Sequence, residues 1–217
     1  MLLEDGISAS ALATLEKKGV LSVERFQIDR MQLTSGKNIA FKELTEAQSK
    51  ALKQLEGEML KHKVSLLHGV TGSGKTEIYV QLIQDQLDQG KQVLFLLPEI
   101  ALTTQLIQRL SAYFGEKIGV YHSKFNQNER VEIWNKVLQD DPHEFRIILG
   151  ARSSVFLPFQ NLGLIIVDEE HESSFKQYDP APRYNGRDAA IVLGRMHEAK
   201  VLLGTATPSL ETYTNAK

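Results

Sequence analysis

Short runs of hydrophobic residues alternate along the chain with longer segments in which hydrophobic positions recur at the spacing of a helix. Runs that are apolar throughout predict buried strands, and their alternation with helices predicts an α/β fold with a parallel sheet covered on both faces. Ligands of such sheets bind beyond the carboxyl ends of the strands. The expected strands are Val64–His68, Val93–Leu97, Ile118–Tyr121, Phe145–Leu149, Leu164–Val167 and Val201–Leu203. The expected helices are Lys75–Gln89, Ala101–Phe114, Asn128–Gln139 and Arg187–Glu198.

A further helix is expected to begin at Thr45–Gln48, which has the form of a capping box, and to run to about Met59. Residues 1–40 do not show the alternation of strands and helices seen in the rest of the chain, and they are too few for a stable domain of their own. We therefore expect them to be the end of a preceding domain or a linker, and residues 41–217 to form the main domain. The elements expected in the first segment are a helix at Ser8–Lys18, a strand at Val20–Arg30 and a turn near Ser35 and Gly36.

The hydrophobic pattern also predicts the position of the Trp134 side chain. Val131, Trp134 and Leu138 share one face of the helix expected at Asn128–Gln139. That face predicts Trp134 as a core residue.

Composition narrows the class of protein. A hydrophobic fraction of 42% in 217 residues excludes a wholly disordered chain, and a net charge of −2 excludes a uniformly basic one, although a local basic stripe can still bind nucleic acid. The absence of cysteine excludes disulfides and cysteine-ligated zinc within this sequence, and it fits a reducing compartment. No run is long enough for a membrane helix and no signal peptide is recognisable, so we expect a cytoplasmic protein without a membrane partner.

The segment Gly69–Thr76 fits the phosphate-loop pattern G-x-x-x-x-G-K-S/T and lies between an expected strand and an expected helix. Backbone N–H groups of such a loop form a nest for phosphate oxygens at the positive end of the helix. The side chain of Lys75 reaches the β- and γ-phosphates, and the hydroxyl of Thr76 is a ligand of Mg²⁺. ATP and Mg²⁺ are therefore the expected cofactors, and a plain glycine-rich connection is the alternative. The remaining phosphate-binding candidates are Gly69, Gly72, Ser73 and Gly74.

An acidic segment follows the strand expected at Leu164–Val167. Asp168 is expected to hold Mg²⁺, and Glu169 to polarise the water that attacks the γ-phosphate. His171 is expected to relay the nucleotide state to neighbouring elements or to make a hydrogen bond within its loop. The alternative for the whole segment is a solvated acidic turn.

Three segments are candidates for contact with DNA. Thr103 lies at the start of an expected helix and can contact backbone phosphate, or the segment is an ordinary helix cap. Arg152 and Ser153 follow another strand, and a surface loop is their alternative. The segment 175–184 mixes aromatic and cationic side chains, which can stack on bases and meet phosphates, or its aromatics are tucked into the core. Its candidates are Phe175, Lys176, Tyr178, Arg183 and Tyr184.

The acidic motif Asp168–His171 after a phosphate loop resembles superfamily 2 helicases. The segments Leu67–Glu77, Leu97–Thr103, Gly150–Ser153 and Asp168–Gln177 together closely resemble the bacterial primosomal replication-restart helicases. The resemblance implies a RecA-like P-loop lobe, in which Gln48 reads adenine and Thr205 and Thr207, in Gly204–Pro208, couple hydrolysis to DNA. It further implies that Gly150–Ser153 contacts a DNA strand and that the aromatic loop couples DNA binding to ATP hydrolysis, although the prolines in Asp179–Pro182 make this loop stiffer than a free platform.

For the intact protein the resemblance implies a 3′→5′ DNA helicase that recognises stalled forks, associates with the nucleoid, and works with single-strand-binding protein and other primosome proteins. Members of the family also carry a winged-helix domain, a second helicase lobe with an arginine finger, and a cysteine-rich zinc module. We therefore expect this chain to be a fragment containing helicase lobe 1, with residues 1–40 as a winged-helix remnant. Zinc is expected only outside this sequence.

Two other classes of function stay open at this point. A different P-loop enzyme, such as a small-molecule kinase, would also need the phosphate loop, although Gln48, Asp168–His171 and Thr205–Thr207 argue against it. A non-catalytic module that uses the sheet as a scaffold for primosome partners is the third possibility.

Overall fold

The computed structural model describes residue 18 and residues 40–102, 104–122 and 125–217. The helix, strand and turn expected within residues 1–40 lie outside this part, apart from residue 18, which is in a turn. The chain divides into two units, Met1–Met31 and Gln32–Lys217, and the sheet with its helices belongs to the second unit. Among the described residues, no helix has both the length and the apolar character that crossing a membrane requires.

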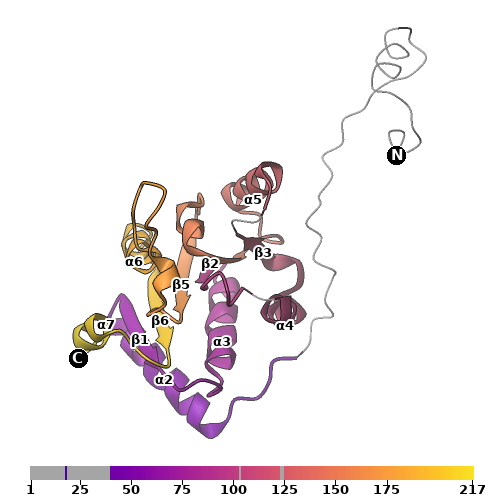
Figure 1. The fold of residues 1–217 in the computed structure, drawn as a ribbon. Coiled ribbons are helices and arrows are strands. Elements are labelled where there is room, and N and C mark those ends of the chain that lie inside the picture. Colours follow the sequence, from indigo (N-terminus) through magenta and orange to yellow (C-terminus); the bar gives the residue numbers. More distant parts are fainter. Residues whose placement is uncertain (1–17, 19–39, 103, 123–124) are drawn as a thin grey trace. The chain divides into compact units, whose positions relative to one another are not determined.

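Six strands of the described chain form one sheet in which every neighbouring pair is parallel (Figure 1). The strand order is β1-β6-β5-β2-β4-β3. The predicted parallel α/β architecture is therefore confirmed. The strands are β1 (Val64–His68), β2 (Gln92–Leu96), β3 (Ile118–Tyr121), β4 (Ile147–Gly150), β5 (Leu162–Asp168) and β6 (Lys200–Thr205).

Helices cover both faces of the sheet (Figure 1). α2, α3 and α4 pack on one face, and α5 and α6 pack on the other. α7 has no counterpart among the sequence predictions, and α4 begins three residues later than predicted. The bounds are α2 (Glu46–Lys61), α3 (Lys75–Asp88), α4 (Thr104–Phe114), α5 (Gln127–Gln139), α6 (Gly186–Met196) and α7 (Leu210–Asn215), with short 3-10 helices η1 (Gly115–Lys117), η2 (Arg152–Phe156) and η3 (Ser173–Phe175).

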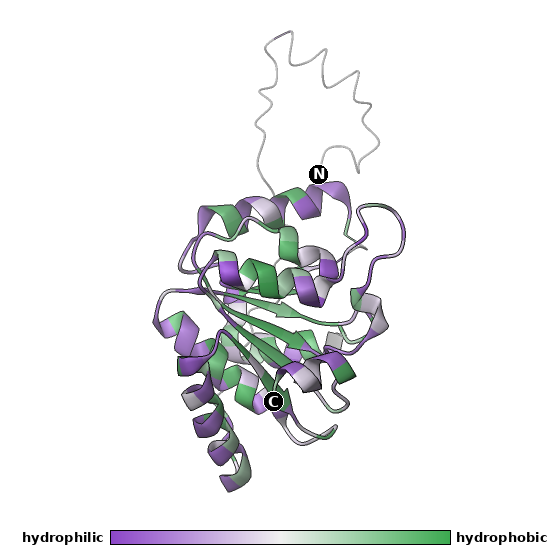
Figure 2. Cartoon of the chain, turned by 90° about the vertical axis from the view of Figure 1, so that its left-hand side faces the viewer, coloured by the Kyte–Doolittle hydropathy of each residue, from purple (hydrophilic) through white to green (hydrophobic). Residues whose placement is uncertain are grey.

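The core consists of two layers that share the sheet. Side chains alternate along each strand, so Val93 and Phe95 of β2 join the cluster under α2, α3 and α4, while Leu94 faces the opposite side. Figure 2 shows the apolar strands enclosed between helices that carry both polar and apolar residues. On the second face, Gly194 of α6 lies so close to Val201 that any side chain there would overlap it. This close approach packs α6, which connects β5 to β6, directly against these two strands.

Local signals set the ends of two elements, and the first of them confirms the capping box that the sequence predicts. The Thr45 side chain accepts the backbone N–H of Gln48, and the Gln48 side chain returns to the Thr45 backbone, which completes the capping box of α2. Gly90 has a φ of 68°, a left-handed conformation that favours glycine, in the turn after α3.

The prediction that Trp134 belongs to the core is wrong. Ile133 and Val137 of α5 are fully buried, whereas Trp134 is 43% exposed and Val131 and Leu138 are exposed beside it. The helix carries two apolar stripes, and hydrophobic periodicity does not tell which stripe faces the sheet. Contact with β3 selects the stripe of smaller, β-branched side chains.

This orientation of α5 predicts unequal costs for two neighbouring substitutions. We expect Ile133→Ala to lower the free energy of unfolding by about 2–5 kcal/mol, because it leaves a cavity against the sheet. Trp134→Ala is expected to cost less than about 1 kcal/mol, since its ring is largely in solvent. Urea unfolding followed by far-ultraviolet circular dichroism measures both. The reverse ranking would mean that the helix is rotated by about one residue.

Candidate nucleotide-binding site and its polar network

The phosphate loop and the acidic segment meet at one edge of the sheet because parallel strands end on the same side. β6 lies between β1, which precedes the loop, and β5, which ends at Asp168. The backbone N–H of Gly69 donates to the carbonyl of Thr205 at 3.0 Å, so the loop starts beside the end of β6. In the register of β5 and β6, Asp168 stands opposite Gly204. The strand order therefore brings together residues that lie far apart in the sequence.

The loop has the backbone geometry that its glycines allow. Gly72 and Gly74 have φ values of 77° and 82°, in the left-handed region. The ammonium group of Lys75, the first residue of α3, donates to the carbonyl of Gly69 at 2.8 Å and lies 3.9 Å from a carboxylate oxygen of Glu169. The cation thus stands between the start of the loop and the acidic segment, with its side chain 10% exposed.

A cavity of about 520 Å³ opens in front of the loop, a size that suits a small-molecule ligand. The sequence-predicted residues that line it are Gln48, Gly72, Ser73, Gly74, Lys75, Thr76, Asp168 and Glu169. Gly69 is not part of the lining. Thr45, Thr71, Glu77 and Arg109 line the cavity as well, and their place in it was not predicted from the sequence. Arg109 of α4 forms an ion pair with Glu77 of α3, which holds a cation at the rim.

Gln48 connects α2 to the phosphate loop. Its side-chain amide nitrogen donates to the carbonyls of Ser73 and Gly74, at 3.4 and 3.3 Å, while its amide oxygen accepts the backbone N–H of Thr45 at 2.9 Å. A side chain at Gly74 would overlap the Gln48 amide. The residue expected to read adenine therefore also sets the position of the loop.

The side chain of Asp168 is held by Tyr79, which the sequence analysis missed. The Tyr79 hydroxyl donates to one carboxylate oxygen of Asp168 at 2.9 Å, and the Tyr79 ring is fully buried. Burial raises the pKa of Asp168, and the Tyr79 hydrogen bond offsets only part of this effect. Burial, and then the negative charge of Asp168, raises the pKa of Tyr79 well above its ordinary value, which keeps the hydroxyl a proton donor. Tyr79 stands four residues after Lys75 on the same helix face, a spacing that could have indicated it.

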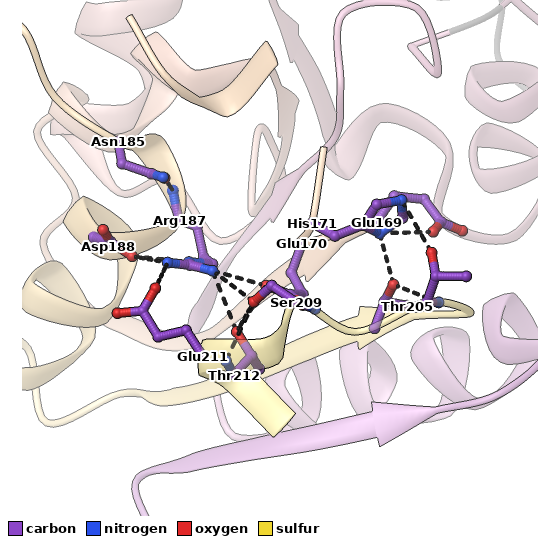
Figure 3. A network of polar contacts seen from close by, with 11 residues as sticks. Glu169, Glu170, His171, Asn185, Arg187, Asp188, Thr205, Ser209, Glu211 and Thr212 are labelled. Carbon is purple, nitrogen blue, oxygen red and sulfur yellow. Dashed lines mark hydrogen bonds and ion pairs between the residues drawn. The ribbon is translucent and has the colours of Figure 1, made fainter. Parts of the chain in front are cut away.

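Glu169 and His171 begin a chain of polar contacts toward the end of β6 (Figure 3). The imidazole of His171 lies 3.7 Å from a carboxylate oxygen of Glu169 and 2.8 Å from the hydroxyl of Thr205. Its other nitrogen lies 3.2 Å from the hydroxyl of Thr207. His171, the residue predicted to relay the nucleotide state, thus contacts Glu169 and both threonines. Glu169 has a φ of 49°, which is uncommon for a residue with a side chain.

Glu170 forms a second, buried network on the opposite side of the same segment (Figure 3). Its carboxylate accepts hydrogen bonds from the Arg187 guanidinium at 3.0 Å, from the Ser209 backbone N–H at 2.8 Å and from the Thr212 hydroxyl at 2.9 Å. Burial would raise the pKa of Glu170, but these hydrogen bonds outweigh it and hold the pKa below its ordinary value. The network ties α6 and α7 to the end of β5. Neither Glu170 nor Arg187 was predicted as a site residue from the sequence.

The DNA-facing candidates gather around η2 and the loop before α6. The Arg152 guanidinium donates to the carbonyl of Ser174 at 2.8 Å, and the Tyr184 ring packs edge-on against Phe156 with 5.0 Å between ring centres. Both candidates are partly exposed, as is Ser153. Phe156 is 55% exposed and was missed by the sequence analysis, although its place shortly after Arg152 and Ser153 was a signal.

The loop itself carries one correction. Phe175 is 1% exposed, so the prediction that its face is free to stack on bases is wrong; η3 turns the ring into the core. Tyr178 is 62% exposed, with the Lys176 ammonium 4.9 Å from its ring centre, and Arg183 is exposed. The side-chain amide of Gln177 donates to two carbonyls across the loop, which closes the loop on itself. Thr103 lies outside the described residues.

The donor set in the cavity fits magnesium held mainly by phosphate. In the described ranges no three His, Cys, Asp or Glu side chains are grouped as a metal site. Mg²⁺ commonly takes one or two protein carboxylates together with substrate phosphates and water, so it needs no such cage. Thr76 and Asp168 line the same cavity, and hydroxyl and carboxylate oxygens are donors of the type that this ion prefers.

Comparison with known proteins agrees with the resemblance that the motifs indicate. A family model described as DEAD/DEAH box helicase matches residues 45–216. Curated proteins named "Replication restart protein PriA" match nearly the whole chain: that of Bacillus subtilis is 43% identical and that of Synechocystis 45%, with 97% and 95% of this chain covered. The chain spans only 26% and 24% of these relatives. A solved structure of RecG bound to a three-way DNA junction has a similar fold, with a TM-score of 0.57 and 24% identity over 80% of this chain and 22% of RecG.

Proposed function

This chain belongs to the DEAD/DEAH box helicase family, and on that basis we propose that it is the ATP-binding motor lobe of a DNA helicase of replication restart. The observation that carries the proposal is the cavity that the phosphate loop lines together with Gln48, Asp168 and Glu169. The names of the PriA relatives support replication restart as the process. A small-molecule kinase would need the phosphate loop but not the chain of contacts from Glu169 through His171 to Thr205 and Thr207.

In the proposed reaction, loop N–H groups and Lys75 bind the phosphates of ATP, and Gln48 contacts the adenine. Thr76 and Asp168 would hold Mg²⁺, which when bound neutralises charge on the β- and γ-phosphates. Glu169, 3.9 Å from the Lys75 ammonium, orients the attacking water and receives its proton. Loss of the γ-phosphate changes the charge that Glu169 faces. His171 passes this change to Thr205 and Thr207, which contact its ring.

The DNA-binding side is proposed from exposure and charge. Tyr178 and Phe156 offer exposed aromatic faces, and Lys176 and Arg183 lie in the same loop region as cations for phosphate. Arg152, Ser153 and Tyr184 support the base of this surface, with Phe175 as its buried anchor. Thr103 is proposed as a further phosphate contact. We assign the intact protein a 3′→5′ direction on fork DNA in the nucleoid, with single-strand-binding protein and primosome proteins as partners.

The 217-residue chain is expected to bind Mg-ATP weakly and to hydrolyse it negligibly, because the relatives are about four times as long and the proposed reaction needs a second lobe to complete the site. The intact protein is expected to hydrolyse ATP at a rate that rises with single-stranded or fork DNA. Equilibrium binding of a fluorescent ATP analogue measures nucleotide affinity, and a phosphate-release assay with and without DNA measures hydrolysis. Phosphoryl transfer to a metabolite, or turnover in the intact protein that DNA leaves unchanged, would contradict the proposal.

A further inference from the structure

Gly204 leaves a space that the Tyr79 hydroxyl fills. Gly204 stands opposite Asp168 across β5 and β6, and Tyr79 comes from α3, one helical turn after Lys75. A Cβ atom at Gly204 would overlap the hydroxyl oxygen of Tyr79 and lie 3.2 Å from the Asp168 oxygen that this hydroxyl contacts. A methyl group at this position therefore cannot coexist with the Tyr79–Asp168 hydrogen bond in its present geometry. The position of the Tyr79 hydroxyl therefore favours glycine at the start of Gly204–Pro208.

The contact joins three elements that carry the proposed chemistry. α3 begins with Lys75 and Thr76, β5 ends with Asp168, and β6 leads to Thr205. Tyr79 is fully buried, and its ring also packs edge-on against Phe95, with 5.5 Å between ring centres, so the hydroxyl has a fixed direction. A carboxylate held on one oxygen by a rigid donor has a fixed orientation, which tunes how it binds a metal.

Resting on the function proposed above, we propose that Tyr79 is a positioning residue for the metal-binding carboxylate: its hydroxyl orients Asp168 toward Thr76 and the cavity, and Gly204 is the residue that makes room for it. Tyr79 itself does not line the cavity. It acts through Asp168, and no part of its role requires contact with nucleotide.

The first test measures magnesium dependence in the intact protein with a fluorescent, non-hydrolysable ATP analogue. Tyr79→Phe is expected to raise the MgCl₂ concentration for half-maximal binding about tenfold, the lower end of effects seen for groups that orient metal ligands. Binding in EDTA is expected to stay within about twofold, since phosphate contacts of the loop are unchanged. In an Asp168→Asn background, Tyr79→Phe is expected to have no further effect on magnesium. Tyr213→Phe, an exposed tyrosine on α7, is the control.

The second test needs no ligand. Gly204→Ala is expected to lower the midpoint of thermal unfolding by about 4–10 °C, the cost of overpacking a buried site. The double variant Tyr79→Phe/Gly204→Ala is expected to recover about half of this loss, because the overlapping oxygen is gone while the ring carbon beneath it, 3.0 Å from the new methyl group, still crowds it. Gly57→Ala, where a Cβ meets nothing within 4 Å, is the control.

The possible outcomes separate the two proposals. A magnesium midpoint that Tyr79→Phe leaves unchanged, or changes equally in the Asp168→Asn background, overturns the positioning role while the proposed function stands. If Gly204→Ala lowers the midpoint of thermal unfolding equally with and without the Tyr79 hydroxyl, the proposal that Gly204 makes room for this hydroxyl is overturned. A protein that binds no ATP analogue at any magnesium concentration overturns the proposed function and this inference together.

Discussion

Replacing Lys75 by alanine is expected to reduce ATP hydrolysis by the intact protein at least about 100-fold and to abolish unwinding, while binding to fork DNA persists. The Lys75 side chain is 10% exposed, and its ammonium group lies between the Gly69 carbonyl and the Glu169 carboxylate. Without the Lys75 ammonium, no cation of the loop offsets the repulsion between the negative charge on the phosphates and the carboxylates of Asp168 and Glu169. The proposed DNA-binding residues stand on other segments and keep their geometry.

Phosphate release and strand-displacement assays measure the two activities, and fluorescence anisotropy of labelled fork DNA measures binding. Lys53→Ala removes an exposed cation from α2 and serves as the matched control. Unwinding that survives in Lys75→Ala would remove this residue from its assigned role. Loss of DNA binding together with hydrolysis would instead indicate that the substitution disturbs the whole lobe.

The second large effect is expected for the buried ion pair of Glu170 and Arg187. Arg187→Met is expected to lower the free energy of unfolding by about 3–5 kcal/mol, because it leaves the Glu170 carboxylate, 2% exposed, without its cation. Arg187 also meets Asp188 and Glu211, but these partners are 58% and 73% exposed in their side chains, where ion pairs contribute little. Glu211→Gln is therefore expected to cost less than about 1 kcal/mol.

Urea unfolding of the 217-residue chain measures these costs. The double variant Glu170→Leu/Arg187→Met is expected to be more stable than Arg187→Met alone, since an apolar pair needs no compensation for a buried charge. An Arg187→Met variant no less stable than Glu211→Gln would show that the guanidinium does not hold α6 and α7 to β5. The same assay on the double variant then tells whether the site tolerates apolar packing at all.

The candidate site shows where sequence reasoning succeeds. The phosphate loop is read from contiguous residues, and the rule that parallel strands end on one side places Asp168 near Lys75 without any coordinates. That rule does not predict which side chains contact these residues. Tyr79 approaches Asp168 only because β6 separates β1 from β5 and carries Gly204 at that level. Apolar strands resemble one another too closely for their order to be deduced from composition.

The pattern of hydrophobic residues also did not determine how exposed individual aromatic side chains are. Phe175 and Tyr178 stand three residues apart in a segment rich in aromatics and cations, yet one is buried and the other is largely in solvent. Trp134 belongs to an apolar stripe that faces away from the sheet. In each case the outcome depends on which neighbour covers the side chain, and those neighbours come from distant parts of the chain.

The sequence by itself determined the features that arise from interactions over a few residues: the alternation of strands and helices, the capping box at Thr45, the left-handed turns at Gly72 and Gly74, and the chemical nature of the phosphate loop. Only the tertiary structure decided the strand order, the face that α5 presents, and the pairing of Glu170 with Arg187. The physical reason is range. Backbone conformation responds to nearest neighbours, whereas burial and polar pairing depend on which segments close around a side chain once the whole core has formed.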